Sequence, residues 1–213
     1  MLETIRQFAE EQLVARGEAE TIRRAHARYF VEREADVMAL WDNPRQREAY
    51  AWFAVELANL RTAFRWAADQ NDLDAAATLV TYASLLGVET ENYEHIAWVE
   101  ELIELARAVG HPRLATLYAV AALCYFAGRV EEAAEYADAA RLLIDSGDFD
   151  EMPYGGEGVL AAPYCMIGQP ERGVEWCRAQ LTRHRDLHDY AYDQIDQARA
   201  ELDAAANRRH SRV

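Results

Sequence analysis

A helix–turn–helix pattern that recurs 40 residues further along the chain constrains the fold more than any other feature of this sequence. The first copy covers residues 114–144 and the second covers residues 159–183, and the two copies place Gly128 opposite Gly168. Helix pairs repeated at a fixed period bury their apolar faces against their neighbours, so the pattern predicts a stack of helix pairs. The glycine at the first of these turns, Gly128, further predicts left-handed backbone there.

Apolar residues follow helical spacing in almost every other segment, and no segment alternates in the way a strand does. We expect one helix over residues 73–86, ended by Gly87, and another over residues 93–109, followed by Gly110. The sequence therefore predicts an all-α fold built from antiparallel helix pairs. Four tryptophans are expected in its core: Trp52, Trp66, Trp98 and Trp176.

Two stretches in the first 70 residues resemble a known family. The first contains MLETIRQFA at residues 1–9 and HARYF at 26–30, and the second is ELANLRTAFRWA at 56–67. Both are similar to the region that follows the ATPase and winged-helix parts of bacterial signal-transduction ATPases with numerous domains, in their LuxR-like and cyclase-linked actinobacterial forms.

The resemblance implies the C-terminal helical arm of such a regulator. It implies an N-terminal helical linker or arm over residues 1–70 and tetratricopeptide-like repeats over residues 71–213, coiled into a right-handed superhelix. The family's phosphate-binding loop, acidic metal-binding strand and winged helix are not among these residues. The resemblance therefore implies no ATPase activity for this chain, whether it is a piece of a longer regulator or a stand-alone relative.

The charge balance of the chain argues against several classes of partner. Its 37 acidic and 22 basic side chains give a formal net charge of −15, which repels nucleic-acid phosphates and anionic membranes. All the basic residues are arginine, so no lysine is present for a nucleotide phosphate or a Schiff base. The N-terminal residues lack the apolar core of a signal peptide, and no apolar run approaches the roughly 20 residues that span a bilayer. We expect a cytoplasmic protein.

Metal binding is the one alternative chemistry that the residues leave open. His184 and His188 stand four apart on an expected helix, a spacing that can place two imidazoles on one side of a zinc ion. No third ligand is evident, and a solvated helix face is the simpler interpretation. The three cysteines, Cys124, Cys165 and Cys177, form no C-x-x-C pair and are expected to be reduced and packed. We therefore predict neither a metal site nor a cofactor.

A partner-binding groove is predicted from aromatic and arginine side chains. In a tetratricopeptide-like register, Tyr118, Tyr125 and Phe126 project from the first helix of a pair toward the concave surface. Arg61 and Arg65 occupy the equivalent face upstream. Both residue types act as anchors in binding grooves because they offer a large contact area. The alternative, that these side chains pack the superhelix itself, stays open.

The repeat, the resemblance and the lack of a coherent catalytic set together favour a non-catalytic regulatory interaction module. Its partner would be a protein, such as the ATPase or winged-helix domains of a regulator, or a small effector. The alternative from another class is a helical metal-dependent enzyme that uses His184 and His188. Direct DNA binding is a third hypothesis, which the net charge opposes.

Overall fold

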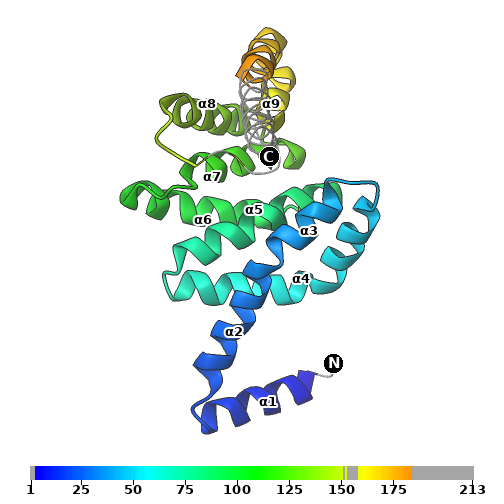
Figure 1. Cartoon of the computed structure of the whole chain (residues 1–213), viewed down its shortest axis with the longest axis vertical. Helices are drawn as coiled ribbons and strands as arrows, with labels where there is room; N and C mark the ends of the chain where they lie inside the picture. Colours follow the sequence, from blue (N-terminus) through cyan, green and yellow to red (C-terminus); the bar gives the residue numbers. More distant parts are fainter. Residues whose placement is uncertain (1–2, 151, 153–157, 184–213) are drawn as a thin grey trace, which may run out of the picture.

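The computed structural model describes residues 3–150, 152 and 158–183, and within these ranges the chain forms helices joined by turns, with no β-strand (Figure 1). The predicted all-α fold is confirmed. None of the described helices is long and apolar enough to cross a membrane. The helices are, in chain order, α1 (Glu3–Ala15), α2 (Ala19–Glu32), α3 (Glu34–Trp41), α4 (Gln46–Asp69), α5 (Leu73–Glu89), α6 (Glu94–Val109), α7 (Leu114–Ala121), the 3-10 helix η1 (Ala122–Ala127), α8 (Val130–Ser146), α9 (Ala161–Met166) and a helix over residues 170–183.

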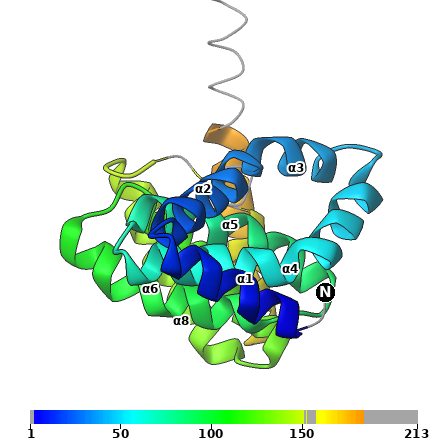
Figure 2. The same cartoon turned by 90° about the horizontal axis from the view of Figure 1, so that it is seen from below.

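Helices that follow one another in the chain also lie next to one another in space. From α4 to α8 each helix packs against the next, as a stack of helix pairs requires, and α9 packs against α8 (Figure 1). The helices α2 and α3 lie across both α4 and α5. By contrast, α1 packs mainly against α2 and projects from one end of the stack (Figures 1 and 2). The right-handed superhelical path stays a prediction.

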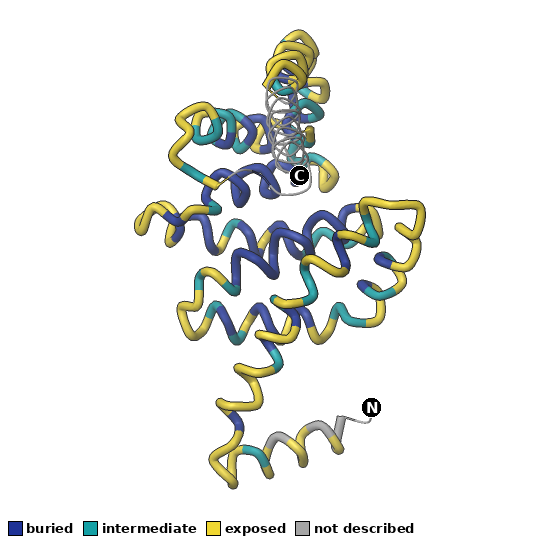
Figure 3. The backbone as a smooth tube through the Cα atoms, in the orientation of Figure 1, coloured by how far each residue is buried: buried dark blue, intermediate teal, exposed yellow. Residues whose placement is uncertain are grey.

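The helix α5 is the centre of the fold. Its residues 76–88 are buried without interruption, and it contacts α2, α3, α4, α6, α7 and η1 (Figure 3). A helix that is apolar on all sides is stable only when neighbours surround it, and its small residues let those neighbours approach closely. The Tyr82 hydroxyl donates a hydrogen bond of 2.9 Å to the backbone oxygen of Phe30, which ties α5 to α2. One core therefore extends across residue 70, the expected boundary between the arm and the repeats.

The turns of the two repeat copies match. The φ angle of Gly128 is 83°, so the left-handed backbone predicted for its turn is confirmed, and Gly168 in the second copy has a similar φ of 74°. In the first copy, the segment before the turn, residues 114–126, was expected to form one helix. It is α-helical only as far as Ala121, and the chain then continues as the 3-10 helix η1. Part of the second copy, residues 153–157, lies outside the described residues.

Gly87 does not end its helix, and that prediction was wrong. The helix α5 continues to Glu89, and Gly87 stands within its last turns. A Cβ atom at this position would lie 2.6 Å from Nδ1 of His95 and 2.8 Å from the backbone oxygen of Asn92. Glycine is needed here because the start of α6 packs directly onto the α5 backbone, and not because a left-handed cap is formed. At Gly110, by contrast, φ is 61° and the predicted helix end is confirmed.

Candidate functional site

The structure distributes the five residues of the predicted groove among three helices. Arg61 and Arg65 lie half-exposed on α4, and Tyr125 and Phe126 lie on η1, where Phe126 is 42% exposed. Tyr118 lies on α7 and is only 6% exposed, so the partial exposure expected for this residue is not found. The arginines and the two η1 aromatics therefore carry the candidate site, and Tyr118 does not.

Tyr118 packs the fold instead of offering a binding surface. Its hydroxyl accepts a hydrogen bond from the Arg107 guanidinium, which also lies over the tyrosine ring at 5.7 Å from its centroid. On its other side the ring contacts Tyr136 at a centroid distance of 6.2 Å. Tyrosine suits such a place because its ring is buried while its hydroxyl still reaches a polar partner. These contacts join α6, α7 and α8.

A groove of about 600 Å³ lies beside α2 and α4, with one lining residue contributed by α1. It contains both predicted arginines, Arg61 and Arg65. Trp66, which was expected in the core, is only half-buried and lines this groove. Trp98 and Trp176 are buried as predicted, and Trp52 is half-buried. The residues that line the groove are Leu13, Ile22, Arg23, His26, Arg61, Thr62, Arg65, Trp66 and Asp69.

Apolar side chains on α1 and α2 are exposed in and around this groove. Ile22 lines it and is 48% exposed, and Leu13 and Trp66 complete its apolar part. The same two helices expose further large apolar side chains: Ile5, Phe8, Val14 and Tyr29. Apolar surface that gathers in a groove, as Leu13, Ile22 and Trp66 do here, is typical of interaction sites. The end of the stack where α1 projects is largely exposed (Figure 3), and the large apolar side chains of α1 and α2 contribute to its surface.

Two ion pairs hold the groove arginines in place. Arg61 contacts both carboxylate oxygens of Glu94, at 2.7 and 2.8 Å, through its Nη2 atom. Arg65 contacts Glu101 at 2.6 Å through Nη1, and its guanidinium lies 5.0 Å from the centroid of the Phe64 ring. A guanidinium carries five N–H donors, so one engaged nitrogen leaves others for a ligand. The pairs orient both arginines without exhausting their hydrogen-bonding capacity.

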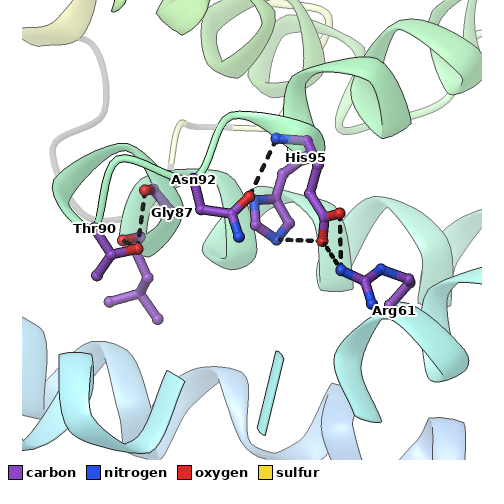
Figure 4. Close-up of polar contacts among 7 residues, drawn as sticks. Arg61, Gly87, Thr90, Asn92 and His95 are labelled. Carbon is purple, nitrogen blue, oxygen red and sulfur yellow. Dashed lines mark hydrogen bonds and ion pairs between the residues drawn. The ribbon is translucent and has the colours of Figure 1, made fainter. Parts of the chain in front are cut away.

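The junction between α5 and α6 positions the carboxylate that holds Arg61 (Figure 4). The Thr90 hydroxyl donates to the backbone oxygen of Gly87 at 3.0 Å, which closes the end of α5. The Asn92 side-chain oxygen then accepts a hydrogen bond from the backbone nitrogen of Glu94 at 3.2 Å. This contact is an Asx turn that directly precedes α6, and Glu94 stands in the first turn of that helix, where it pairs with Arg61 of α4.

His95 follows Glu94 and is buried beneath the ion pair, with 1% of its surface exposed. Its ring centroid lies 5.4 Å from that of Phe53 and 4.5 Å from that of Trp98. Neither ring nitrogen has a hydrogen-bond partner among the described residues, and Nε2 lies 3.9 Å from the nearest Glu94 oxygen. Burial lowers the pKa of His95 to about 4, against the opposing effects of the Glu94 charge and the Asn92 backbone. The ring is therefore neutral at pH 7, and the Glu94 carboxylate is left to Arg61.

His26 is the histidine that lines the groove. Burial lowers its pKa below the ordinary value, while the charge of Glu56 and a hydrogen bond with Asn59 act in the opposite direction. The imidazole is therefore mostly neutral at pH 7 and adds polar, uncharged surface to the groove. Neither His26 nor Trp66 was identified from the sequence as a site residue, because neither has a spacing that distinguishes a groove from a core.

Tyr125 and Phe126 form an aromatic stack with a third residue, Tyr93. The rings of Tyr125 and Phe126 are 4.3 Å apart with an interplanar angle of 27°, and those of Tyr93 and Phe126 are 6.5 Å apart at 14°. Tyr93 and Tyr125 are half-buried, so Phe126 is the most exposed of the three. No spacing rule connects Tyr93 with residues on η1, which is why the sequence did not indicate it.

The described residues hold no group of three or more histidine, cysteine or acidic side chains that could bind a metal ion. His184 and His188, the basis of the metal hypothesis, lie outside the described residues. Cys124 is buried as expected, and burial raises its pKa to about 11. Cys165 and Cys177 are exposed, so the prediction that they pack was wrong. Cys165 lies on the short helix α9, and Cys177 lies on the helix over residues 170–183.

In comparisons with known proteins, no family model, curated protein or solved structure matches this chain. Its own geometry defines it as an all-helical stack that carries an apolar groove and a separate aromatic stack.

Proposed function

We propose that this protein is a non-catalytic regulatory interaction module whose groove beside α2 and α4 binds a helical segment of a protein partner. The observation that carries this proposal is the groove's apolar lining, Leu13, Ile22 and Trp66, next to the uncovered apolar side chains of α1 and α2. An amphipathic helix that lays its apolar face into such a groove buries both surfaces at once.

The shallow lining favours a protein segment over a small effector. Ile22, Arg61 and Arg65 are all about half-exposed although they line the groove. A small-molecule site usually encloses about 70–90% of its ligand, which half-exposed walls do not achieve. A helix needs to be covered on one face only. Arg61 and Arg65, one helical turn apart, then supply polar contacts at the rim of the apolar contact.

The resemblance of residues 1–70 to the arm of the signal-transduction ATPases supports a particular kind of partner. In that family the arm follows the ATPase and winged-helix parts, so these parts are the proposed partners of the groove. A regulatory role in transcription or signalling, tetratricopeptide-like repeat geometry and a cytoplasmic location are parts of the same proposal. It involves no catalytic step, cofactor, membrane or direct contact with nucleic acid.

Selection of helical peptides tests the groove directly. A displayed library of amphipathic helices is selected against the full chain, and the selected peptides are titrated against two variants. Ile22→Glu places a charge in the groove, and Val55→Glu makes the same change at an exposed position on α4 that does not line it. We expect Ile22→Glu to weaken binding at least tenfold, about 1.4 kcal/mol, and Val55→Glu to change it less than twofold.

The thermal melting temperatures of both variants serve as controls for folding. Selection of peptides whose affinity is the same for the wild type and Ile22→Glu would contradict the proposal. Failure to select any helical peptide would contradict it as well.

A further inference from the structure

The aromatic stack of Tyr93, Tyr125 and Phe126 is a second surface, built from different elements than the groove. Tyr93 directly precedes α6, and the other two residues lie on η1. Phe126 contacts both tyrosine rings in nearly parallel arrangements and is itself 42% exposed. Exposed aromatic faces carry the negative part of the ring quadrupole, which attracts cations, and guanidinium groups stack on them particularly well.

Two carboxylates accompany this aromatic stack. Glu89 lies close enough to Tyr125 for its charge to contribute, after burial, to the raised pKa of that hydroxyl. Glu91 stands two residues before Tyr93 in the short connection between α5 and α6. Both glutamates are exposed, and neither forms a salt bridge within the described part of the chain. Glu94 and Glu101, by contrast, form salt bridges with the groove arginines.

The backbone adds negative potential at the same place. Glu89 is the last residue of α5, so the carbonyl end of that helix faces this turn. Helix C-termini carry a partial negative charge and favour cations within about one turn. The partly exposed Phe126 side chain, two exposed carboxylates without a salt bridge in the described part of the chain and a helix C-terminus thus all favour a ligand of the same charge. The chain's net charge of −15 attracts such a ligand from a distance.

We propose that the aromatic stack and the carboxylates of Glu89 and Glu91 form a docking surface for an arginine-containing segment of a protein partner. The guanidinium stacks on the exposed Phe126 ring and pairs with a carboxylate at the edge of the stack. This surface is independent of the groove proposed above, because it shares no residue with it.

The experiment uses the full chain with ¹³C-labelled aromatic rings and two short probes. One is a pentapeptide of alternating glycine and arginine, and the other has citrulline in place of arginine, which keeps the shape and removes the charge. We expect the arginine peptide to shift the ring signals of Tyr93 and Phe126 saturably. The citrulline peptide should bind about tenfold more weakly or worse.

Three variants distinguish specific binding of the arginine side chain at the aromatic stack from general electrostatic attraction to the negatively charged protein. Phe126→Leu keeps an apolar side chain and removes the ring, and we expect the Tyr93 shifts to weaken at least threefold. Glu91→Gly removes a carboxylate at a position where φ is 56°, which glycine adopts without strain, so we expect weaker binding in a protein of undiminished stability. Glu135→Gln makes the same charge change at an exposed position on α8 and should leave binding within twofold.

Three outcomes would overturn the proposal. The first is equal binding of the arginine and citrulline peptides. The second is a loss of affinity for the arginine peptide in Glu135→Gln that is as large as the loss in Glu91→Gly. This result would show that the peptide is attracted only by the overall charge of the protein. The third is displacement of the arginine peptide by tetramethylammonium at equal concentration, which would indicate a site for small cations. Ile22→Glu should leave this binding unchanged, so failure of the groove proposal and failure of this one are distinguishable.

Discussion

The helices α5 and α1 have similar lengths and opposite surroundings. The charged residues of α5, Asp74 and Glu89, stand near its two ends, and everything between residues 76 and 88 is buried. In α1 the large apolar side chains Ile5 and Phe8 are exposed, and the helix packs mainly against α2. Helix formation and burial are therefore separate properties in this protein. The central helix has apolar surface that the fold itself covers, whereas the N-terminal helices have apolar surface that a partner would cover.

The largest effect expected within the covered region is a dependence of stability on pH through His95. Its pKa is about 4 in the folded protein and about 6.5 in the unfolded chain. Between these values the unfolded state binds a proton that the folded state does not, so stability falls as the pH is lowered from about 6.5 to about 4. The shift corresponds to about 3 kcal/mol over the whole window. Urea unfolding at pH 7 and pH 4.5 measures most of this change.

The variant His95→Phe keeps an aromatic ring beside Phe53 and Trp98 and removes the titration. The difference between wild type and variant isolates His95, because His26, whose pKa is also lowered, contributes equally to both. An identical pH dependence in the two proteins would show that His95 is not buried as a neutral ring.

A smaller loss of stability is expected from a substitution at Gly87, where α6 packs onto α5. Gly87→Ala places a Cβ 2.8 Å from the backbone oxygen of Asn92, which cannot move away cheaply. Crowding of this kind typically costs about 1–3 kcal/mol, which outweighs the gain of up to about 1 kcal/mol from replacing glycine by alanine in a helix. Gly158→Ala is the matched control, because its Cβ would have no neighbour within 4 Å. We expect a lower melting temperature for Gly87→Ala alone, and equal melting temperatures would contradict the close packing.

Apolar periodicity in the sequence predicted the features that depend on residues close along the chain. It did not predict the features that depend on which residues lie close together in the folded structure. The all-helical character of the chain and the left-handed turn at Gly128 are local features, and both were predicted correctly. Gly87 looks like a helix stop in the sequence, and its packing role depends on residues that follow a turn later. Tyr118 and Phe126 belong to one expected helix face, yet Tyr118 is buried and contacts Arg107, whereas Phe126 is 42% exposed.

The candidate site likewise combines features that depend on sequence spacing with features that depend on how the helices pack. Arg61 and Arg65 both line the groove beside α2 and α4, because their spacing of four places them on one side of α4. That this groove is the predicted partner-binding surface stays a prediction. The opposite wall comes from α2, and no pattern in the sequence indicates which face of α4 the helix α2 would leave open. Tyr93 joins the aromatic stack across 33 positions of the chain for the same reason.

Amide hydrogen exchange compares the two regions most directly and tests the claim that the uncovered N-terminal surface is a binding surface. In the free protein we expect α1 and the first half of α2 to exchange quickly and residues 76–88 of α5 to exchange slowly. On addition of a helical peptide selected for the groove, α1 and α2 should gain protection at least tenfold, while α5 should change little. Unchanged exchange in α1 and α2 with the peptide bound would contradict the account, as would protection of α1 in the free protein equal to that of α5.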